Sequence, residues 1–374
     1  MKNRRISYPR IFGVFALIII FIFGFDSLKR NAAKKNAEDN LESIISVVTE
    51  TSPPDIGQYT TETTSNKSIM VDNERYREID KPSGDIEKGP LVLVNDEHKY
   101  NFPDISDSTS SIYDSMTAQH YKLSYPTHIA QNELLVKLNQ MMDDFYTLYN
   151  TNDMTITSAY RTLDQQKELY EGTQSSYVTP EYMPQPGFSE HHTGYALDFT
   201  LVSSSGKITP YDASGDFAWV NSNCYKYGFL VRYPQDKTDK TGVDYQPWHF
   251  RYVGVPHSFI MNEQKLCLEE YIDYLKKYEF SKDHLRYSVY GYDYEIYYVP
   301  AQEGQTKVPI PVDRKYDISG NNVDGFIVTI TEAGAELKTT TVPDPASSET
   351  GSVTQIPAGT SSSAVTSAAS STSY

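Results

Sequence analysis

The sequence predicts an α+β fold, because the expected helices and strands mix without the steady strand–helix–strand rhythm of a parallel α/β sheet. Two observations carry this prediction: an amphipathic helical pattern over residues 131–150, and several short strand-like runs between turn-forming residues. With 39% hydrophobic and 22% charged residues, the composition is ordinary for a protein with a real core. At 374 residues, the chain is long enough for one sizeable domain with extensions.

The first predicted helix, 131–150, has apolar residues at three- and four-residue intervals, which places them on one helical face. These residues are Leu134, Leu138, Met142, Phe145 and Leu148. A short strand is expected at 154–160, followed by a helix at 161–172 that Gly172 closes. The folded part of the chain therefore begins with a helix, a strand and a second helix.

A second group of elements follows a proline-rich loop around 183–187. The stretch SEHHTGYALDFT, residues 189–200, places two adjacent histidines before a strand-like run that contains an aspartate. A helix is expected at 215–228, and strands are expected at 229–233 and 248–254.

The C-terminal part of the fold is predicted as a small β-rich extension. An amphipathic helix is expected at 263–278, and residues 285–299 alternate at period two with tyrosines on both faces. Residues 325–330 follow an SGNN turn and indicate another strand. Packing is the favoured role for these tyrosines, with carbohydrate contact as the alternative.

Polar segments separate the predicted domains. Residues 29–111 indicate a mostly disordered extracellular stalk with one strand-like run, PLVLVN, and residues 338–374 form a Ser/Thr-rich tail that has too little apolar surface to fold. Between them we expect a main domain at 112–262 and the helix plus β-rich extension at 263–337.

Residues 1–28 predict a cytoplasmic flank and a membrane anchor. Four basic residues within the first ten precede an uncharged apolar run from Ile11 to Phe25. No small-residue cleavage site follows directly, which favours an uncleaved single-pass anchor, and the basic flank places the rest of the chain outside. A secreted protein with an atypical cleavage site is the alternative.

Charge and cysteine content limit the classes of partner and the kinds of site that the sequence leads us to expect. The net charge of −16 argues against nucleic acid, because phosphate contacts need clustered Lys and Arg. Cys224 and Cys267 would lie in an oxidising compartment, where a disulfide between them is an open prediction. Their spacing offers no CxxC pair, so a thiolate metal site is not expected.

A metal site is the chemistry that the histidines and the aspartate indicate. His191 and Asp198 are seven residues apart, which suits two ends of a loop-to-strand segment around one ion. His249 lies in a strand-like run beside Trp248, where an unpaired imidazole would be costly to bury. Because a catalytic zinc uses three protein ligands, these three residues form a candidate set. Spacing alone leaves ordinary, satisfied histidines as the alternative.

Three motifs in order carry a family resemblance: SAYRTLDQQ, SEHHTGYALD and QPWHFRYVG. Over about residues 112–262 the chain resembles the VanY-type zinc D-alanyl-D-alanine carboxypeptidases, which have the Hedgehog/D,D-peptidase fold. The resemblance implies a metalloprotease on the bacterial cell surface that trims the stem peptides of peptidoglycan. The motifs do not decide between D,D- and L,D-specificity.

The resemblance also implies residue roles. Zinc would bind His191, Asp198 and His249, with His192 as a neighbour that is not a ligand. Arg161 matches the arginine that helps to bind substrate and to stabilise the developing oxyanion. The implied substrate-binding residues around it are Ser158, Tyr160, Gln166 and Ser189. Gly194 would allow a close backbone approach.

One position departs from the family pattern. Where the family has a catalytic glutamate three residues before the last histidine, this chain has Gln246, and an amide cannot take a proton from water. Glu190 and Asp244 are nearby substitutes, but neither has the family's spacing. Two hypotheses follow: an active zinc carboxypeptidase that removes a terminal D-alanine, or a catalytically weak relative that binds peptidoglycan peptides. An endopeptidase of the same fold is a third, weaker reading.

Overall fold

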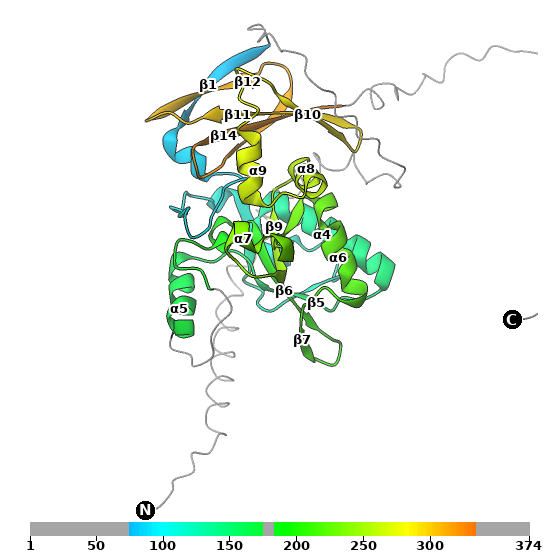
Figure 1. Ribbon diagram of the computed structural model, residues 1–374. Helices are drawn as coiled ribbons and strands as arrows, with labels where there is room; N and C mark the ends of the chain where they lie inside the picture. Colours follow the sequence, from blue (N-terminus) through cyan, green and yellow to red (C-terminus); the bar gives the residue numbers. More distant parts are fainter. Residues whose placement is uncertain (1–74, 175–182, 334–374) are drawn as a thin grey trace, which may run out of the picture.

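A computed structural model of the chain describes residues 75–174 and 183–333. These residues form a mixed helix and sheet fold, so the α+β prediction is confirmed. Figure 1 shows a larger helix-and-sheet part below and a group of C-terminal strands above it. The larger part contains every candidate site residue named above.

Six strands form the sheet of the larger part, in the order β3-β5-β6-β9-β8, with β7 paired to the C-terminal half of β6. β3 and β5 run parallel, whereas the other neighbouring strands are antiparallel. Their bounds are β3 Lys122–Leu123, β5 Met154–Ser158, β6 Ala196–Val202, β7 Ile208–Pro210, β8 Phe229–Tyr233 and β9 Gln246–Tyr252. The predicted strands at 154–160, 229–233 and 248–254 correspond to β5, β8 and β9.

Helix α4 (Asn132–Tyr149) is the long amphipathic helix that the sequence predicts. Its apolar face is buried in the main core, including Leu134, Leu138 and Phe145. Leu148 is instead 59% exposed, so the buried stripe ends one turn earlier than predicted. The helix stops at Asn150, whose left-handed conformation closes the last turn.

Two other predicted helices are divided in the structure. The run 215–228 forms η4 (Gly215–Phe217), α6 (Ala218–Asn223) and η5 (Cys224–Tyr227). The run 263–278 contains the end of α8 (His257–Gln264) and then α9 (Leu268–Leu275), because Lys265 has φ of 53° and interrupts the helix. The remaining helices are η1 Ser83–Glu87, η2 Ser106–Ser108, α3 Ile112–Ser115, α5 Leu163–Gln174, η3 Glu190–Thr193, η6 Gln235–Lys237 and α7 Thr238–Thr241.

The C-terminal extension is a four-stranded antiparallel sheet in the order β10-β11-β14-β13. Its strands are β10 Leu285–Val289, β11 Tyr292–Pro300, β13 Lys315–Gly320 and β14 Gly325–Ala333. The alternating run 285–299 is a hairpin rather than one strand, since Tyr290 and Gly291 have φ of 55° and 72° and form its two-residue turn. Tyr297 and Tyr298 are buried, as the packing interpretation expects.

The predicted stalk is wrong for the part of it that the structure describes. β1 (Tyr76–Pro82) pairs along its whole length with β12 (Gln305–Pro311), and β2 (Thr109–Ser111) pairs with β4 (Ile129–Gln131). The run PLVLVN is buried but is not a strand; the amide of Leu93 donates to the carbonyl of Asn321 at 3.0 Å. The partners of β1 lie far away in sequence, so no local pattern reveals them.

Several predictions concern residues that lie outside the described ranges. The anchor within 1–28, the stalk up to 74 and the tail 338–374 are among them. Within 75–174 and 183–333, no helix has the length and apolar character needed to cross a bilayer. Cys224 and Cys267 are described, and both are free and buried, so the disulfide that the sequence left open is not formed.

Candidate metal centre and substrate site

Three neighbouring strands bring Ser158, Asp198 and His249 into one row across the sheet. Ser158 on β5 lies opposite Asp198 on β6, and Asp198 lies opposite His249 on β9. Residues directly opposite one another on paired strands project from the same face of a sheet. An irregularity in β5 between Ile156 and Ser158 sets this register.

His191 reaches the same place from η3, the short 3₁₀ turn that precedes β6. The turn ends at Gly194, whose φ of 74° favours glycine. A Cβ at this position would lie 3.3 Å from the side chain of Gln131, which also donates to the carbonyl of Thr193 at 2.9 Å. Gly194 therefore allows the Gln131 side chain to approach the turn closely.

The three candidate ligands converge on one point. His191 Nε2 lies 2.9 Å from Asp198 Oδ2, and His249 Nδ1 lies 2.7 Å from Asp198 Oδ1. One donor atom from each residue lies within 4.8 Å of the other two. Both histidines are buried, whereas the Asp198 side chain is 20% exposed, so the cluster is reached from the side of the carboxylate.

Protein acceptors hold the other nitrogen of each ring. His191 Nδ1 lies 2.7 Å from the carbonyl of Ala159, and His249 Nε2 lies 3.3 Å from Glu190 Oε2. Because a carbonyl and a carboxylate accept, the proton of each neutral ring lies on that nitrogen, and the opposite lone pair points into the cluster. Two imidazole nitrogens and one carboxylate oxygen fit a zinc ion with a fourth position left for water.

Electrostatics within the cluster favour a carboxylate between two imidazoles. Burial opposes the charged form of Asp198, but His191 and His249 outweigh it and hold its pKa well below the usual range. Burial likewise opposes protonation of His249, but Asp198 and Glu190 raise its pKa to about 9. Burial lowers the pKa of His191. A metal would replace the proton that His249 otherwise holds.

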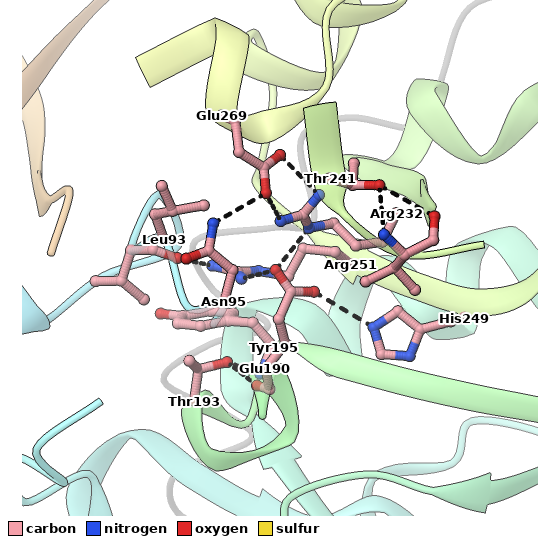
Figure 2. A network of polar contacts seen from close by, with 12 residues as sticks. Leu93, Asn95, Glu190, Thr193, Tyr195, Arg232, Thr241, His249, Arg251 and Glu269 are labelled. Carbon is pink, nitrogen blue, oxygen red and sulfur yellow. Dashed lines mark hydrogen bonds and ion pairs between the residues drawn. The ribbon is translucent and has the colours of Figure 1, made fainter. Parts of the chain in front are cut away.

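Glu190 lies behind His249 and is fully buried (Figure 2). Its Oε1 accepts from Arg232 Nε at 2.7 Å and from Arg251 Nη1 at 2.8 Å. Burial opposes its charge, but the two guanidinium groups outweigh it and hold the Glu190 pKa far below its usual range. A carboxylate held in this way is a poor base, so Glu190 positions His249 rather than replacing the missing glutamate.

The charge network extends from Glu190 to helix α9. Arg232 donates from both terminal nitrogens to the Glu269 carboxylate, at 3.0 and 2.7 Å (Figure 2), while Arg251 donates to the carbonyls of Pro90 and Val92. Sequence reasoning missed this network. A signal was present, since an arginine within an apolar strand run such as FLVRY or HFRYV is almost never buried without a partner.

Gln246 is the first residue of β9 and is half-buried. Between the pairs Val231–Phe250 and Tyr233–Gln246, two steps on β8 correspond to four on β9, so β9 is bulged next to His249. Asn221 Nδ2 donates to the carbonyl of Pro247 within this bulge at 3.0 Å. In a regular strand, residues three apart face opposite sides of the sheet. Because of the bulge, this rule does not apply to Gln246 and His249. Asp244, the other candidate base, is exposed and precedes β9.

Arg161 lies beside the cluster and is fixed at both ends of its guanidinium. Nη2 donates to Ser158 Oγ and Nη1 donates to Gln166 Oε1, both at 2.6 Å. Gln166 is fully buried and donates in turn to the carbonyl of Pro184 at 2.7 Å. The Arg161 amide donates to the carbonyl of His191 at 3.1 Å, so this arginine and the cluster share one framework.

The remaining predicted residues have less direct positions. His192 Nδ1 lies 2.7 Å from the carbonyl of Arg161, and its Nε2 accepts from the amide of Gly187 at 3.1 Å, so both nitrogens are used within the protein. Burial lowers the pKa of His192 to about 4. Ser189 is buried at the start of η3, where its carbonyl accepts from the His192 amide. Tyr160 lines an adjacent hollow.

Comparisons with known proteins point to one family. A family model described as VanY, D-alanyl-D-alanine carboxypeptidase, matches residues 127–255, which include every candidate site residue. A D-alanyl-D-alanine carboxypeptidase of Enterococcus faecium is 37% identical over 244 residues, 65% of this chain and 75% of that protein. The bifunctional D-Ala-D-Ala dipeptidase and carboxypeptidase VanXYC of Enterococcus gallinarum is 40% identical over 131 residues, 33% of this chain and 68% of that protein.

A solved structure shows the same likeness over a longer stretch. The D,D-dipeptidase VanXYg, in complex with a D-Ala-D-Ala phosphinate analogue, has a TM-score of 0.60 and 31% sequence identity. The match covers 69% of this chain and 99% of that chain. The likeness therefore extends well beyond the 129 residues between positions 127 and 255.

Proposed function

This chain belongs to the VanY family of D-alanyl-D-alanine carboxypeptidases, and from that premise we propose that it is a zinc-dependent peptidase that acts on peptidoglycan stem peptides ending in D-alanine. The observation that carries the proposal is the convergence of His191, Asp198 and His249 on one point. The proposed reaction is hydrolysis of the last peptide bond, with release of the terminal D-alanine.

The residues of the site suit this reaction. When bound, zinc would lower the pKa of a water ligand and polarise the scissile carbonyl. Arg161, held by Ser158 and Gln166, provides a permanent positive charge beside the cluster for the carbonyl oxygen of the substrate. Glu190 keeps the His249 ring oriented, and so preserves the geometry of the metal-binding atoms after one substrate leaves and before the next one binds.

Gln246 supports a second candidate function: a weakly active or inactive relative that binds stem peptides. An amide cannot accept a proton from water, and general-base help is typically worth about 10²- to 10⁴-fold in rate. The Glu190 carboxylate is paired with Arg232 and Arg251, so it does not substitute for the missing base. Turnover by the wild type is therefore expected to be slow.

One exchange separates the two candidates. Hydrolysis of a peptide ending in D-Ala-D-Ala is measured by released D-alanine for the wild-type full chain and for Gln246→Glu, with zinc content measured in both. We expect zinc in both proteins, slow hydrolysis by the wild type, and a rate about 10²- to 10⁴-fold higher for Gln246→Glu. Absence of zinc from the wild type would contradict the metal proposal.

The controls cover the other outcomes. His249→Ala removes a proposed ligand and should lose both zinc and hydrolysis. A wild type that hydrolyses the peptide quickly and is slowed by Gln246→Glu would exclude the weak-relative candidate. Mass analysis of the products tests the endopeptidase reading, since internal cleavage releases fragments larger than alanine. The full chain is required because β1 precedes residue 112.

The location of the protein is part of the proposal. We propose a single-pass anchor within residues 1–28 that holds the folded residues outside the cell, near peptidoglycan. Support comes from the basic residues before the apolar run 11–25. Membrane fractionation, followed by protease treatment of intact cells, tests it: the C-terminal part should sediment with membranes and be accessible from outside.

A further inference from the structure

A hollow of about 260 Å³ lies on the C-terminal sheet, which contributes no residue to the candidate metal centre. Residues 286–288 of β10, 293–295 of β11, and 330 and 332 of β14 line it, and we call it the hairpin hollow. It lies at the end of the sheet where Tyr290 and Gly291 form the turn between β10 and β11.

The two faces of the sheet differ at this end. Tyr287 and Tyr294 lie opposite one another on β10 and β11, so their side chains share one face. That face packs on the larger part of the molecule, where the Tyr287 hydroxyl donates to Glu263 on α8 at 3.1 Å. Successive side chains of a strand alternate between faces, so Arg286 and Asp293 lie on the other face. Of the residues that line the hairpin hollow, none therefore directs an aromatic ring into it.

The base of the hairpin hollow is a carboxylate that the protein already satisfies. Glu295 is buried and accepts four hydrogen bonds, from Tyr76, His284, Arg286 and Arg314. Two of these donors are guanidinium groups, so the charge of Glu295 is balanced within the fold. A ligand would bind to the groups around Glu295 rather than to Glu295 itself.

Arg286 and Asp293 have binding capacity left. The Arg286 side chain is 52% exposed and makes one hydrogen bond within the described residues, from Nη1 to Glu295, so most of its N–H donors remain available. Asp293 is exposed, and its Oδ1 accepts from Ser288 Oγ at 2.6 Å. Its second carboxylate oxygen has no partner among the described residues. The hairpin hollow thus offers a cationic donor and an anionic acceptor.

The strand register places these two groups close together. Arg286 lies opposite Glu295, and Ser288 lies opposite Asp293, so Arg286 and Asp293 are diagonal neighbours on one face. Diagonal neighbours on antiparallel strands are about 7–8 Å apart at their Cα atoms. One small molecule is therefore able to accept from Arg286 and donate to Asp293 at the same time.

The lining excludes several other kinds of ligand. Within 75–174 and 183–333, only His191, Asp198 and His249 bring three donor atoms close enough for one metal ion, so the carboxylates of the hairpin hollow do not form a divalent cation site. Three carboxylates against one lining guanidinium disfavour a simple anion. A sugar ring commonly stacks on an aromatic ring, and the lining offers none. A small molecule with both charges remains.

We propose that the hairpin hollow binds a free α-amino acid, with its carboxylate on Arg286 and its ammonium group on Asp293. An α-amino acid carries both charges on one carbon, which matches two diagonal neighbours on a sheet. Charge-assisted hydrogen bonds of this kind are about twice as strong as neutral ones. D-Alanine, the product of the reaction proposed above, belongs to this class, but the inference does not rest on that reaction.

Equilibrium dialysis of the zinc-loaded full chain against isotopically labelled D-alanine tests the proposal. Low ionic strength is used because salt screens exposed ion pairs. Three competitors differ in charge: L-alanine carries both charges, propionate lacks the ammonium group, and alaninamide lacks the carboxylate. Alanine held at the metal centre would be unaffected by a change at Asp293, so comparison of variants isolates the hairpin hollow.

We expect D- and L-alanine to bind within about two-fold of each other, because the proposal assigns no contact to the ligand's side chain. Alanine should bind about ten-fold more tightly than propionate, which loses a charged hydrogen bond and meets carboxylates. It should bind about two- to five-fold more tightly than alaninamide.

Variants of the protein should reproduce these differences. Asp293→Asn keeps an oxygen for Ser288 and should weaken alanine about two- to five-fold without weakening propionate. Arg286→Gln should weaken alanine similarly without weakening alaninamide. Asp283→Asn, at an exposed acid that does not line the hairpin hollow, is the matched control and should change nothing.

Three results would overturn the proposal. Alaninamide binding as tightly as alanine would show that the hairpin hollow recognises a cation alone. Equal effects of Asp293→Asn and Asp283→Asn would place alanine elsewhere, as would a strong preference for D-alanine that Asp293→Asn leaves unchanged. Absence of alanine binding would exclude the site. Because none of these measurements involves hydrolysis, failure of the proposed peptidase activity would remain a separate result.

Discussion

Two buried glutamates, one in each part of the molecule, have closely similar surroundings. Each carboxylate is held by two arginines and one histidine. Glu190 is held by Arg232, Arg251 and His249, and Glu295 is held by His284, Arg286 and Arg314. The first cluster lies behind the metal centre, and the second joins the C-terminal sheet to β1 through Tyr76.

The two clusters differ at the second nitrogen of the histidine. His284 Nε2 lies 3.0 Å from the carbonyl of Phe280, so the protein itself uses both ring nitrogens. His249 Nδ1 instead points toward Asp198 and the imidazole of His191. A buried charge cluster is therefore not in itself a functional signal. The convergence of Asp198 and His191 on the second nitrogen of His249 is what distinguishes the candidate metal centre.

The largest expected effect is that of Glu190→Ala. This change leaves Arg251 and Arg232 buried without the carboxylate between them, which should cost about 3–5 kcal/mol in the free energy of unfolding. It also releases the His249 ring, so zinc affinity should fall about 10- to 100-fold. Urea denaturation and zinc competition with a chelator measure the two effects. Unchanged zinc affinity in a folded variant would contradict the positioning role.

Glu295→Ala is the matched change in the other cluster. Arg286 is half-exposed and can be hydrated, so the expected loss in the free energy of unfolding is smaller, about 1–3 kcal/mol. Zinc affinity should stay within two-fold of the wild type, because His284 does not face the metal centre. A large loss of zinc affinity in this variant would remove the distinction between the two clusters.

Acid should weaken the Glu295 cluster. Burial opposes the charge of Glu295, but His284, Tyr76 and the two arginines outweigh it and lower its pKa to about 2. A carboxylate whose pKa is lower in the folded state stabilises the fold above its unfolded pKa, and this contribution is lost as the pH falls from about 4.5 toward 2.

The loss of this contribution is measurable as a change in the slope of the free energy of unfolding against pH. This group contributes at most about 1.4 kcal/mol per pH unit to the free energy of unfolding. Denaturation at several pH values between 5 and 2 should therefore show a steeper decline for the wild type than for Glu295→Gln. Identical slopes would mean that Glu295 has no lowered pKa in the folded protein.

The smallest expected effect is that of Tyr76→Phe. The Tyr76 hydroxyl donates to Glu295 Oε1 at 2.7 Å and accepts from Arg314 at 3.0 Å, so its loss should cost about 1 kcal/mol. Thermal unfolding measures it. Tyr113→Phe, at a tyrosine that is 60% exposed, is the control and should leave the melting temperature unchanged. Equal behaviour of the two variants would show that the hydroxyl of Tyr76 does not hold β1 in place.

The sequence predicted those features that depend on nearby residues. The face of α4 follows from a 3.6-residue period, and the donors His191 and Asp198 lie on one turn and the strand after it. His249 was selected from its strand-like run beside Trp248, the family resemblance then implied its role as a ligand, and the pairing of β6 with β9 brings it to Asp198. Each of these features follows from a local pattern or from a motif with the spacing of the family.

Features that depend on distant partners were missed. The polar alternation of 76–82 gives no sign of β12, and the burial of Glu190 depends on arginines from two other strands. The sequence left the disulfide between Cys224 and Cys267 open for the same reason, since the position of two cysteines in the chain says nothing about whether their side chains meet. One local feature was missed as well: the two-residue turn at Tyr290 and Gly291 joins two strands, whereas the alternation over 285–299 was interpreted as one strand.

The pairing of β1 with β12 has a consequence for biosynthesis. Residues 76–82 leave the ribosome early, but their partner begins only at residue 305. At about 5–20 residues per second, the nascent chain carries this strand unpaired for roughly ten seconds or longer. The two-stranded β1–β12 sheet is thus completed only late in translation, and a transcript truncated before codon 305 would yield a product with an exposed N-terminal strand.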